Sequence, residues 1–164
     1  MGRKKVLVFS VLMFVIAGLL YTYFFIISPT FVAKPQIEKP TLAEGQPVEP
    51  KHVQWLVNEL GAYKLHNPPF SGKIPEMEML VTTDNKYFTV TVKQNFPEVS
   101  EGRATNPDIR ISGSREVVAK LLAAGDIIAE AKKLSDEGKI KLDILKDMTE
   151  LAAMGYKALY DELG

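Results

Sequence analysis

The sequence predicts an α+β domain, with a small, mostly antiparallel sheet covered by helices, preceded by one N-terminal transmembrane helix. Three observations lead to this prediction. A long apolar run lies near the N-terminus, short segments alternate between apolar and polar residues, and longer segments repeat apolar residues at helical spacing. A domain of this kind buries its apolar helix stripes against one face of the sheet.

The apolar run covers residues 6–27 and follows Arg3, Lys4 and Lys5. A helix of this length measures about 33 Å, which is enough to cross a hydrocarbon core of roughly 30 Å. We therefore expect residues 1–28 to form a single-pass signal anchor in the membrane bilayer. Flanking basic residues stay in the cytoplasm, so we expect a cytoplasmic N-terminus and an extracytoplasmic C-terminal domain. A cleaved signal peptide is the alternative, but its apolar stretch would be only about 7–15 residues long.

The region after the anchor divides into a tether and a domain. Five prolines are spread over residues 29–50 among polar and charged residues, which predicts an extended Pro-rich tether. Residues 51–164 have a normal length for one hydrophobic core. The whole chain has 20 basic and 20 acidic residues, so beyond the basic start acidic residues exceed basic ones by three, which argues against a nucleic-acid partner. The absence of cysteine excludes disulfides and thiolate chemistry.

The domain is expected to begin with a helix at Pro50, whose apolar stripe runs from Val53 to Tyr63. Trp55 lies off this stripe. Either the loop at residues 66–75 covers it, or its side chain is offered to a partner or to the membrane interface.

A β-hairpin should follow, with strands at residues 76–83 and 87–95 joined by a turn at residues 84–86. A polar loop rich in Pro, Gly and Asn comes next. Ile109 and Ile111 then mark a short strand.

The last third of the chain alternates helices with one strand. Ser112 or Ser114 should cap a helix that ends at Gly125, and Asp126 should cap a second helix that ends near Gly138. The final predicted elements are a strand around residues 140–142 and a single helix over residues 145–163, in which Gly155 lies on the apolar stripe.

Residues 106–155 resemble a known family. Their sequence is NPDIRISGSREVVAKLLAAGDIIAEAKKLSDEGKIKLDILKDMTELAAMG, in which an aspartate leads into a short apolar strand and a capped helix. A second helix and a Gly-Lys-Ile-Lys strand then precede the terminal helix. This order resembles the second half of the sterol carrier protein type-two (SCP-like) lipid-binding domain, and the first half of the domain matches in element order.

The resemblance implies an apolar tunnel that accepts one sterol, acyl chain or other lipid without catalysis. Residues expected on the inner faces are the candidates for its lining, although the same residues would also fill an ordinary closed core. They are Phe88, Val90, Val92, Ile109, Ile111, Val118, Leu122, Ile140, Leu142, Leu151 and Met154.

Enzymatic activity is not expected. His52 and His66 are the only histidines, and the chain has no nucleophile elbow, P-loop or dinucleotide fingerprint. We therefore expect no catalytic residue, no cofactor and no metal.

Two functions are consistent with the sequence. The first is a membrane-anchored module for lipid binding and lipid transport, which binds or presents a single lipid on the extracytoplasmic face. The second is a membrane-anchored structural domain with a closed core, which binds a membrane protein partner through Trp55 or the hairpin edge.

Overall fold

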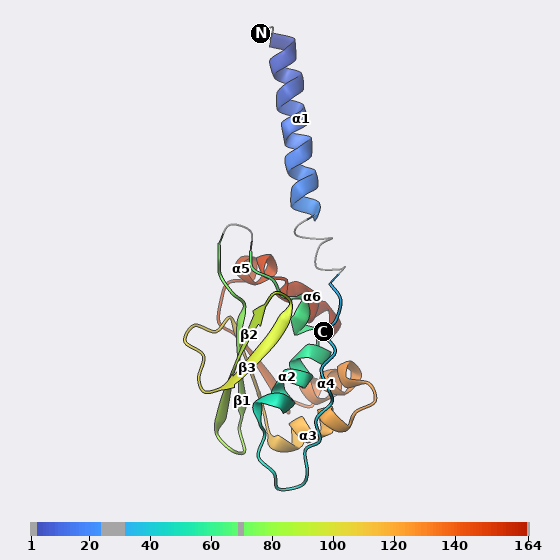
Figure 1. Ribbon diagram of the computed structural model, residues 1–164, viewed down its shortest axis with the longest axis vertical. Coiled ribbons are helices and arrows are strands. Elements are labelled where there is room, and N and C mark those ends of the chain that lie inside the picture. The colour runs from blue at the N-terminus through green and yellow to red at the C-terminus, as the bar shows by residue number, and fades with distance from the viewer. Residues whose placement is uncertain (1–2, 24–31, 69–70, 164) are drawn as a thin grey trace. The chain divides into compact units, whose positions relative to one another are not determined.

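The computed structural model describes residues 3–23, 32–68 and 71–163. The chain forms two compact units, residues 1–32 and 33–164 (Figure 1). The side chains of residues 3–9, of residue 158 and of residues 161–163 lie outside the description.

The first unit contains helix α1 (Arg3–Thr22). Among the residues that the structure describes, no helix combines the length and the apolar character that a membrane crossing requires. Part of the predicted anchor, residues 24–27, lies outside the described residues. The transmembrane helix predicted for residues 6–27 is therefore not found in the described part of the chain.

The second unit is built on a five-stranded sheet. Its spatial order is β3-β2-β1-β4-β5, and only the β1–β4 pair is parallel. The predicted mostly antiparallel α+β architecture is thus confirmed. The strands are β1 (Glu76–Val81), β2 (Lys86–Lys93), β3 (Phe96–Glu101), β4 (Ile109–Gly113) and β5 (Ile140–Ile144).

Helices begin where their capping residues predict. The Ser114 hydroxyl accepts a hydrogen bond from the Val117 amide (3.4 Å), and the Asp126 carboxylate accepts one from the Ala129 amide (3.0 Å). The helices of this unit are α2 (Pro50–Glu59), the short 3-10 helix η3 (Ala62–Lys64), α3 (Arg115–Ala123), α4 (Ile127–Asp136), α5 (Met148–Ala153) and α6 (Tyr156–Leu163).

Strand β3 replaces part of the predicted polar loop, so the loop prediction was wrong for residues 96–101. Gln94 and Asn95 adopt positive φ angles of 50° and 62°, as a two-residue hairpin turn requires. Pro97 has no amide hydrogen to donate, but β3 is an edge strand and tolerates it. β2 is consequently paired with both β1 and β3, and β1 is also paired with β4, so neither strand of the predicted hairpin is an edge to which a partner could dock.

The predicted helix over residues 145–163 is broken into α5 and α6. Gly155 has φ +89°, a left-handed conformation that ends α5. A Cβ at this position would lie 3.1 Å from the His66 ring, so the glycine also permits a close approach. The His66 amide donates to the Met154 carbonyl at 3.1 Å, which fixes this corner.

Residues 33–49, part of the predicted tether of residues 29–50, belong to the second unit and contact its other elements. Val48 is fully buried, the Pro35 carbonyl accepts from Asn58 Nδ2 (3.0 Å), and Lys39 Nζ lies 5.0 Å from the Trp55 ring centroid. Trp55 is buried, with Lys39 of this segment over its ring. It is therefore not offered to a partner.

Candidate functional site

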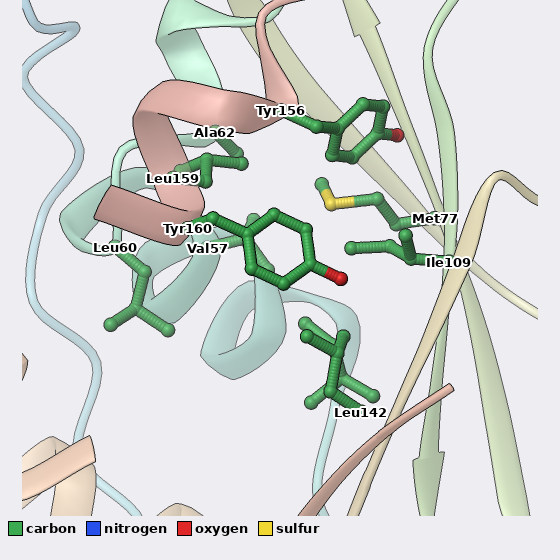
Figure 2. A pocket seen from close by; sticks show the side chains of 10 residues that line it. Val57, Leu60, Ala62, Met77, Ile109, Leu142, Tyr156, Leu159 and Tyr160 are labelled. Atoms are coloured by element: carbon green, nitrogen blue, oxygen red, sulfur yellow. The ribbon is translucent and has the colours of Figure 1, made fainter. Parts of the chain in front are cut away.

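A small apolar cavity of about 60 Å³ lies between the sheet and helices α2 and α6 (Figure 2). The side chains that surround it come from four parts of the fold: α2 with the turn after it, the central strands, the edge strand β5 and α6. They belong to Val57, Leu60, Ala62, Met77, Ile109, Ile111, Leu142, Tyr156, Leu159 and Tyr160.

A larger cavity of about 240 Å³ extends toward α3 and α4. It is also surrounded mainly by aliphatic side chains, with two serines at its edge. The residues that line it are Leu56, Val57, Leu60, Met79, Ile111, Ser112, Gly113, Val117, Leu121, Ala131, Ser135, Ile140, Leu142 and Tyr160.

The two cavities adjoin, because five side chains line both of them. These are Val57, Leu60, Ile111, Leu142 and Tyr160. Together they bring one helix (α2), two neighbouring strands and the C-terminal helix α6 to a single apolar junction.

Local sequence patterns explain this junction. Val57 of α2 and Leu60, the residue that caps the C-terminus of this helix, are three residues apart, so their side chains lie on the same side. Ile111 of β4 is directly opposite Leu142 of β5 in the sheet, which places both side chains on the same face. Since β5 is the edge strand, Leu142 remains 39% exposed and forms part of the rim.

A buried polar network fixes the start of α6 beside the smaller cavity. The Tyr156 hydroxyl donates to Asp108 Oδ2 at 3.0 Å, and the Glu76 amide donates to the same oxygen at 2.9 Å. Lys73 Nζ lies 2.8 Å from Asp108 Oδ1 and is also paired with Glu150. The carboxylate of fully buried Asp108 is thus paired, as a buried charge must be.

The same network shifts two pKa values. Burial, followed by the charge of Asp108, raises the pKa of Tyr156 well above its usual value near 10, because both disfavour a phenolate. Burial lowers the pKa of Lys73, but its hydrogen bonds to Asp108 and Glu150 outweigh this effect and give a net rise. Tyr156 is therefore a neutral donor and Lys73 a cation at neutral pH.

Four of the eleven predicted lining residues lie at these cavities, namely Ile109, Ile111, Ile140 and Leu142. The other seven belong to the buried core and line neither cavity. They are Phe88, Val90, Val92, Val118, Leu122, Leu151 and Met154.

Sequence reasoning missed the contribution of α2 and of the tyrosines of α6. Val57, Leu60 and Tyr160 all lie on apolar stripes that the sequence displays. The stripes identify buried faces, but periodicity does not show where a buried face meets a void. The tyrosines on the stripe of α6 were the one sequence signal for the site, because a buried tyrosine hydroxyl usually needs a hydrogen-bond partner that an apolar core does not supply.

Comparisons with known proteins give structural likenesses. No protein-family model and no curated protein matches the chain. The chain is similar to a solved structure described as "UbiJ-SCP2 Ubiquinone synthesis protein", with a TM-score of 0.37, 14% identity, and coverage of 55% of this chain and 71% of that one. It is also similar to Sterol Carrier Protein 2 Like 2 from Aedes aegypti, with a TM-score of 0.35, 17% identity, and coverage of 66% and 94%.

A third likeness is to the stereoselective inverting sec-alkylsulfatase Pisa1 from Pseudomonas sp.. Its TM-score is 0.35 at 14% identity, over 50% of this chain but only 12% of the sulfatase chain. Structures of the sterol carrier type are thus among those that the chain is similar to. Because each TM-score is below 0.5, we base no functional conclusion on these likenesses.

Proposed function

We propose that residues 33–164 bind one lipid-like apolar molecule in the two adjoining cavities. The observation that carries this proposal is the shared apolar junction formed by Val57, Leu60, Ile111, Leu142 and Tyr160. An ordinary closed core leaves few voids larger than a water molecule. The space of about 240 Å³ is partly open to solvent at its rim, and with the smaller cavity beside it the apolar layer between sheet and helices has room for a ligand.

The chemistry of the lining favours an apolar ligand over water. Apolar walls offer water few hydrogen-bond partners and therefore favour small apolar molecules, as enclosed apolar cavities of roughly 150 Å³ do. The larger cavity exceeds that size, and its wall is mainly aliphatic. The half-exposed side chain of Leu142 on edge strand β5 supplies an apolar rim for entry.

A cavity-filling substitution tests the proposal. Ala131 is buried in α4 and lines the larger cavity, so Ala131→Leu should occupy part of the ligand's volume. We expect this variant to bind a pyrene-labelled dodecane at least 10-fold more weakly than the wild type in a fluorescence titration. Ala129→Leu is the matched control, because Ala129 lies exposed on the same helix. Equal binding by wild type, variant and control would refute the proposal.

We also propose that the chain is a single-pass membrane protein with residues 33–164 on the extracytoplasmic side. The support is the sequence: the apolar run of residues 6–27 and the basic residues that precede it. An anchored binding domain would act at a high local concentration of membrane lipid.

Site-directed labelling tests this topology cleanly because the chain has no cysteine. Lys120 is exposed, so Lys120→Cys in the full chain should react with a membrane-impermeant maleimide added to intact cells. Gly2→Cys should react only after the membrane is permeabilised. Labelling in the opposite order would contradict the proposed orientation.

We propose that the function is binding or presentation of the lipid rather than catalysis. The sequence supports this because it has no motif of a catalytic nucleophile or cofactor site. Incubation of the protein with an ester-containing lipid should therefore leave the ester intact by mass spectrometry.

A further inference from the structure

The hydroxyl of Tyr160 lies at the junction of the two cavities. Tyr160 lines both of them, and Figure 2 shows its ring extending from α6 with the hydroxyl directed toward the sheet, on the side of Ile109 and Leu142. The oxygen is buried and has no hydrogen-bond partner among the residues that the structure describes. Tyr160 thus brings one unused polar atom to an otherwise apolar junction.

A buried tyrosine hydroxyl without a hydrogen-bond partner is unusual in a folded protein. Most buried side-chain polar atoms are hydrogen-bonded, and a buried tyrosine hydroxyl usually finds an acceptor. Tyr156, on the same helix, follows this rule by donating to Asp108 Oδ2 at 3.0 Å. Burial raises the pKa of Tyr160 above its usual value, so its hydroxyl keeps its proton at neutral pH and can donate it.

The acceptor should be uncharged. None of the described residues that line either cavity carries a charged side chain, and Tyr160 is a neutral donor. A carboxylate or phosphate beside the Tyr160 hydroxyl would find no cation among the described lining residues of these two cavities, which is unfavourable for a buried charge. A ketone or ester oxygen needs only one donor, and at the junction that the two cavities share Tyr160 is the one described lining residue with a polar side chain.

We propose that Tyr160 donates a hydrogen bond to a neutral oxygen of the bound lipid, such as a ketone or ester carbonyl. This inference rests on the proposed function and narrows its ligand class. Since the larger cavity has about four times the volume of the smaller one, the oxygen should have a short apolar group on one side and a longer chain on the other. Dodecan-2-one has this form and serves as a probe.

The experiment compares three probes on the full chain in lipid nanodiscs. Dodecan-2-one, dodecane and dodecanoate each compete with pyrene-labelled dodecane for wild type, Tyr160→Phe and Tyr63→Phe. Tyr63→Phe is the matched control, because it removes a hydroxyl from a tyrosine that lines neither cavity. The ratio of the dissociation constant of each variant to that of the wild type cancels the partition of a probe into the nanodisc.

We expect Tyr160→Phe to weaken dodecan-2-one binding by roughly 3- to 10-fold, the usual effect of losing one neutral hydrogen bond. Dodecane binding should stay unchanged, and Tyr63→Phe should change neither. The 13C=O stretch of labelled dodecan-2-one should move to higher frequency in Tyr160→Phe alone.

Each other outcome overturns the inference. An unchanged affinity for dodecan-2-one in Tyr160→Phe would mean that water satisfies the hydroxyl, while the proposed lipid binding would stand. Tyr160-dependent binding of dodecanoate tighter than that of dodecan-2-one would refute the neutral acceptor. Failure of both dodecan-2-one and dodecane to compete with the wild type would refute the proposed function and this inference together.

Discussion

Two regions of the sheet differ in how completely they are packed. In β2, next to the edge strand β3, Phe88, Val90 and Val92 are essentially fully buried. At the β5 end, Ile111 is half-buried, Leu142 is 39% exposed and the two cavities adjoin. All five side chains come from strands with the same alternating pattern. The alternating sequence of a strand therefore determines which side chains face the helices. How closely those side chains are packed depends on the elements that lie over them.

The cover differs because of the chain's topology. At the packed end, α2 lies against β2 and β3, and Val48 of the segment before α2 joins the core. At the cavity end, β5 is an edge strand, and α4 packs against it. We infer that the closed end stabilises the fold and that the open end is free to bind a ligand.

The largest expected effect comes from removing a large side chain at the packed end. Phe88→Ala should lower the free energy of unfolding by about 3–5 kcal/mol, because it leaves a cavity in a closed core. Leu142→Ala should cost less than about 1.5 kcal/mol, since part of that side chain is already in water. Urea unfolding of both variants measures the difference. Equal costs would mean that the two ends are packed alike.

The polar network beside the cavity should give the next effect. Tyr156→Phe removes a hydrogen bond to the Asp108 carboxylate and should cost about 1.5–3 kcal/mol. The folded-state pKa of Tyr156 is raised, so its contribution is complete below the unfolded value near 10 and is lost as the pH rises above it. Lys73 acts in the same direction, because its pKa is also raised.

The pH dependence separates this network from simple packing. Wild-type stability should fall above about pH 10, by up to 1.4 kcal/mol per pH unit for each such group. In Tyr156→Phe the slope of unfolding free energy against pH should be shallower, because about one proton fewer is released on unfolding. Tyr87→Phe is the control, because the Tyr87 hydroxyl lies outside this network and accepts a hydrogen bond from Arg103. An identical slope of stability against pH in the two variants would show that Tyr156 is not the group responsible.

Enlarging a side chain should also distinguish the two regions, because added atoms destabilise a closed core but can be accommodated in a cavity. Val90→Leu inserts volume into a closed core and should cost about 1–3 kcal/mol. Ala131→Leu directs its added atoms toward the larger cavity and should leave the free energy of unfolding within about 0.5 kcal/mol of the wild type or raise it. Thermal unfolding of the two variants is the measurement. A loss of more than 1 kcal/mol in Ala131→Leu would argue against an open cavity.

The smallest effect concerns the corner that positions α6. Gly155→Ala should cost about 1–2 kcal/mol, because an alanine is strained at φ +89° and its Cβ would meet the His66 ring. Gly125→Ala is the control, since its φ is ordinary and nothing lies within 4 Å of the added carbon. Hydrogen exchange in α6 should rise in the first variant only. Equal stability of the two variants would show that the conformation of Gly155 is not needed to position α6.

Local signals in the sequence predict much of this fold. Ser114, one of the two serines predicted to cap the helix, begins α3, and Asp126 begins α4 as predicted; the alternation of residues 76–93 places β1 and β2 correctly. These features depend on near neighbours in the chain. Hydrogen bonds within three residues and period-two patterns are visible before tertiary structure exists.

Features that depend on distant residues were not predictable. The cover of Trp55 comes from residues 33–49, and the conformation of Gly155 depends on its approach to His66. Strand β3 contains few apolar residues and exists because β2 pairs with it. The cavities were not predictable for the same reason, because their walls come from elements in four separate parts of the chain.

The most direct test of the account is native mass spectrometry of residues 33–164 purified without detergent, as wild type and as Ala131→Leu. The account predicts a discrete added mass on the wild type, extractable as a lipid with a neutral oxygen, and a reduced occupancy on the variant. A bare polypeptide mass for the wild type, unchanged when dodecan-2-one and membrane lipids are supplied, would contradict it.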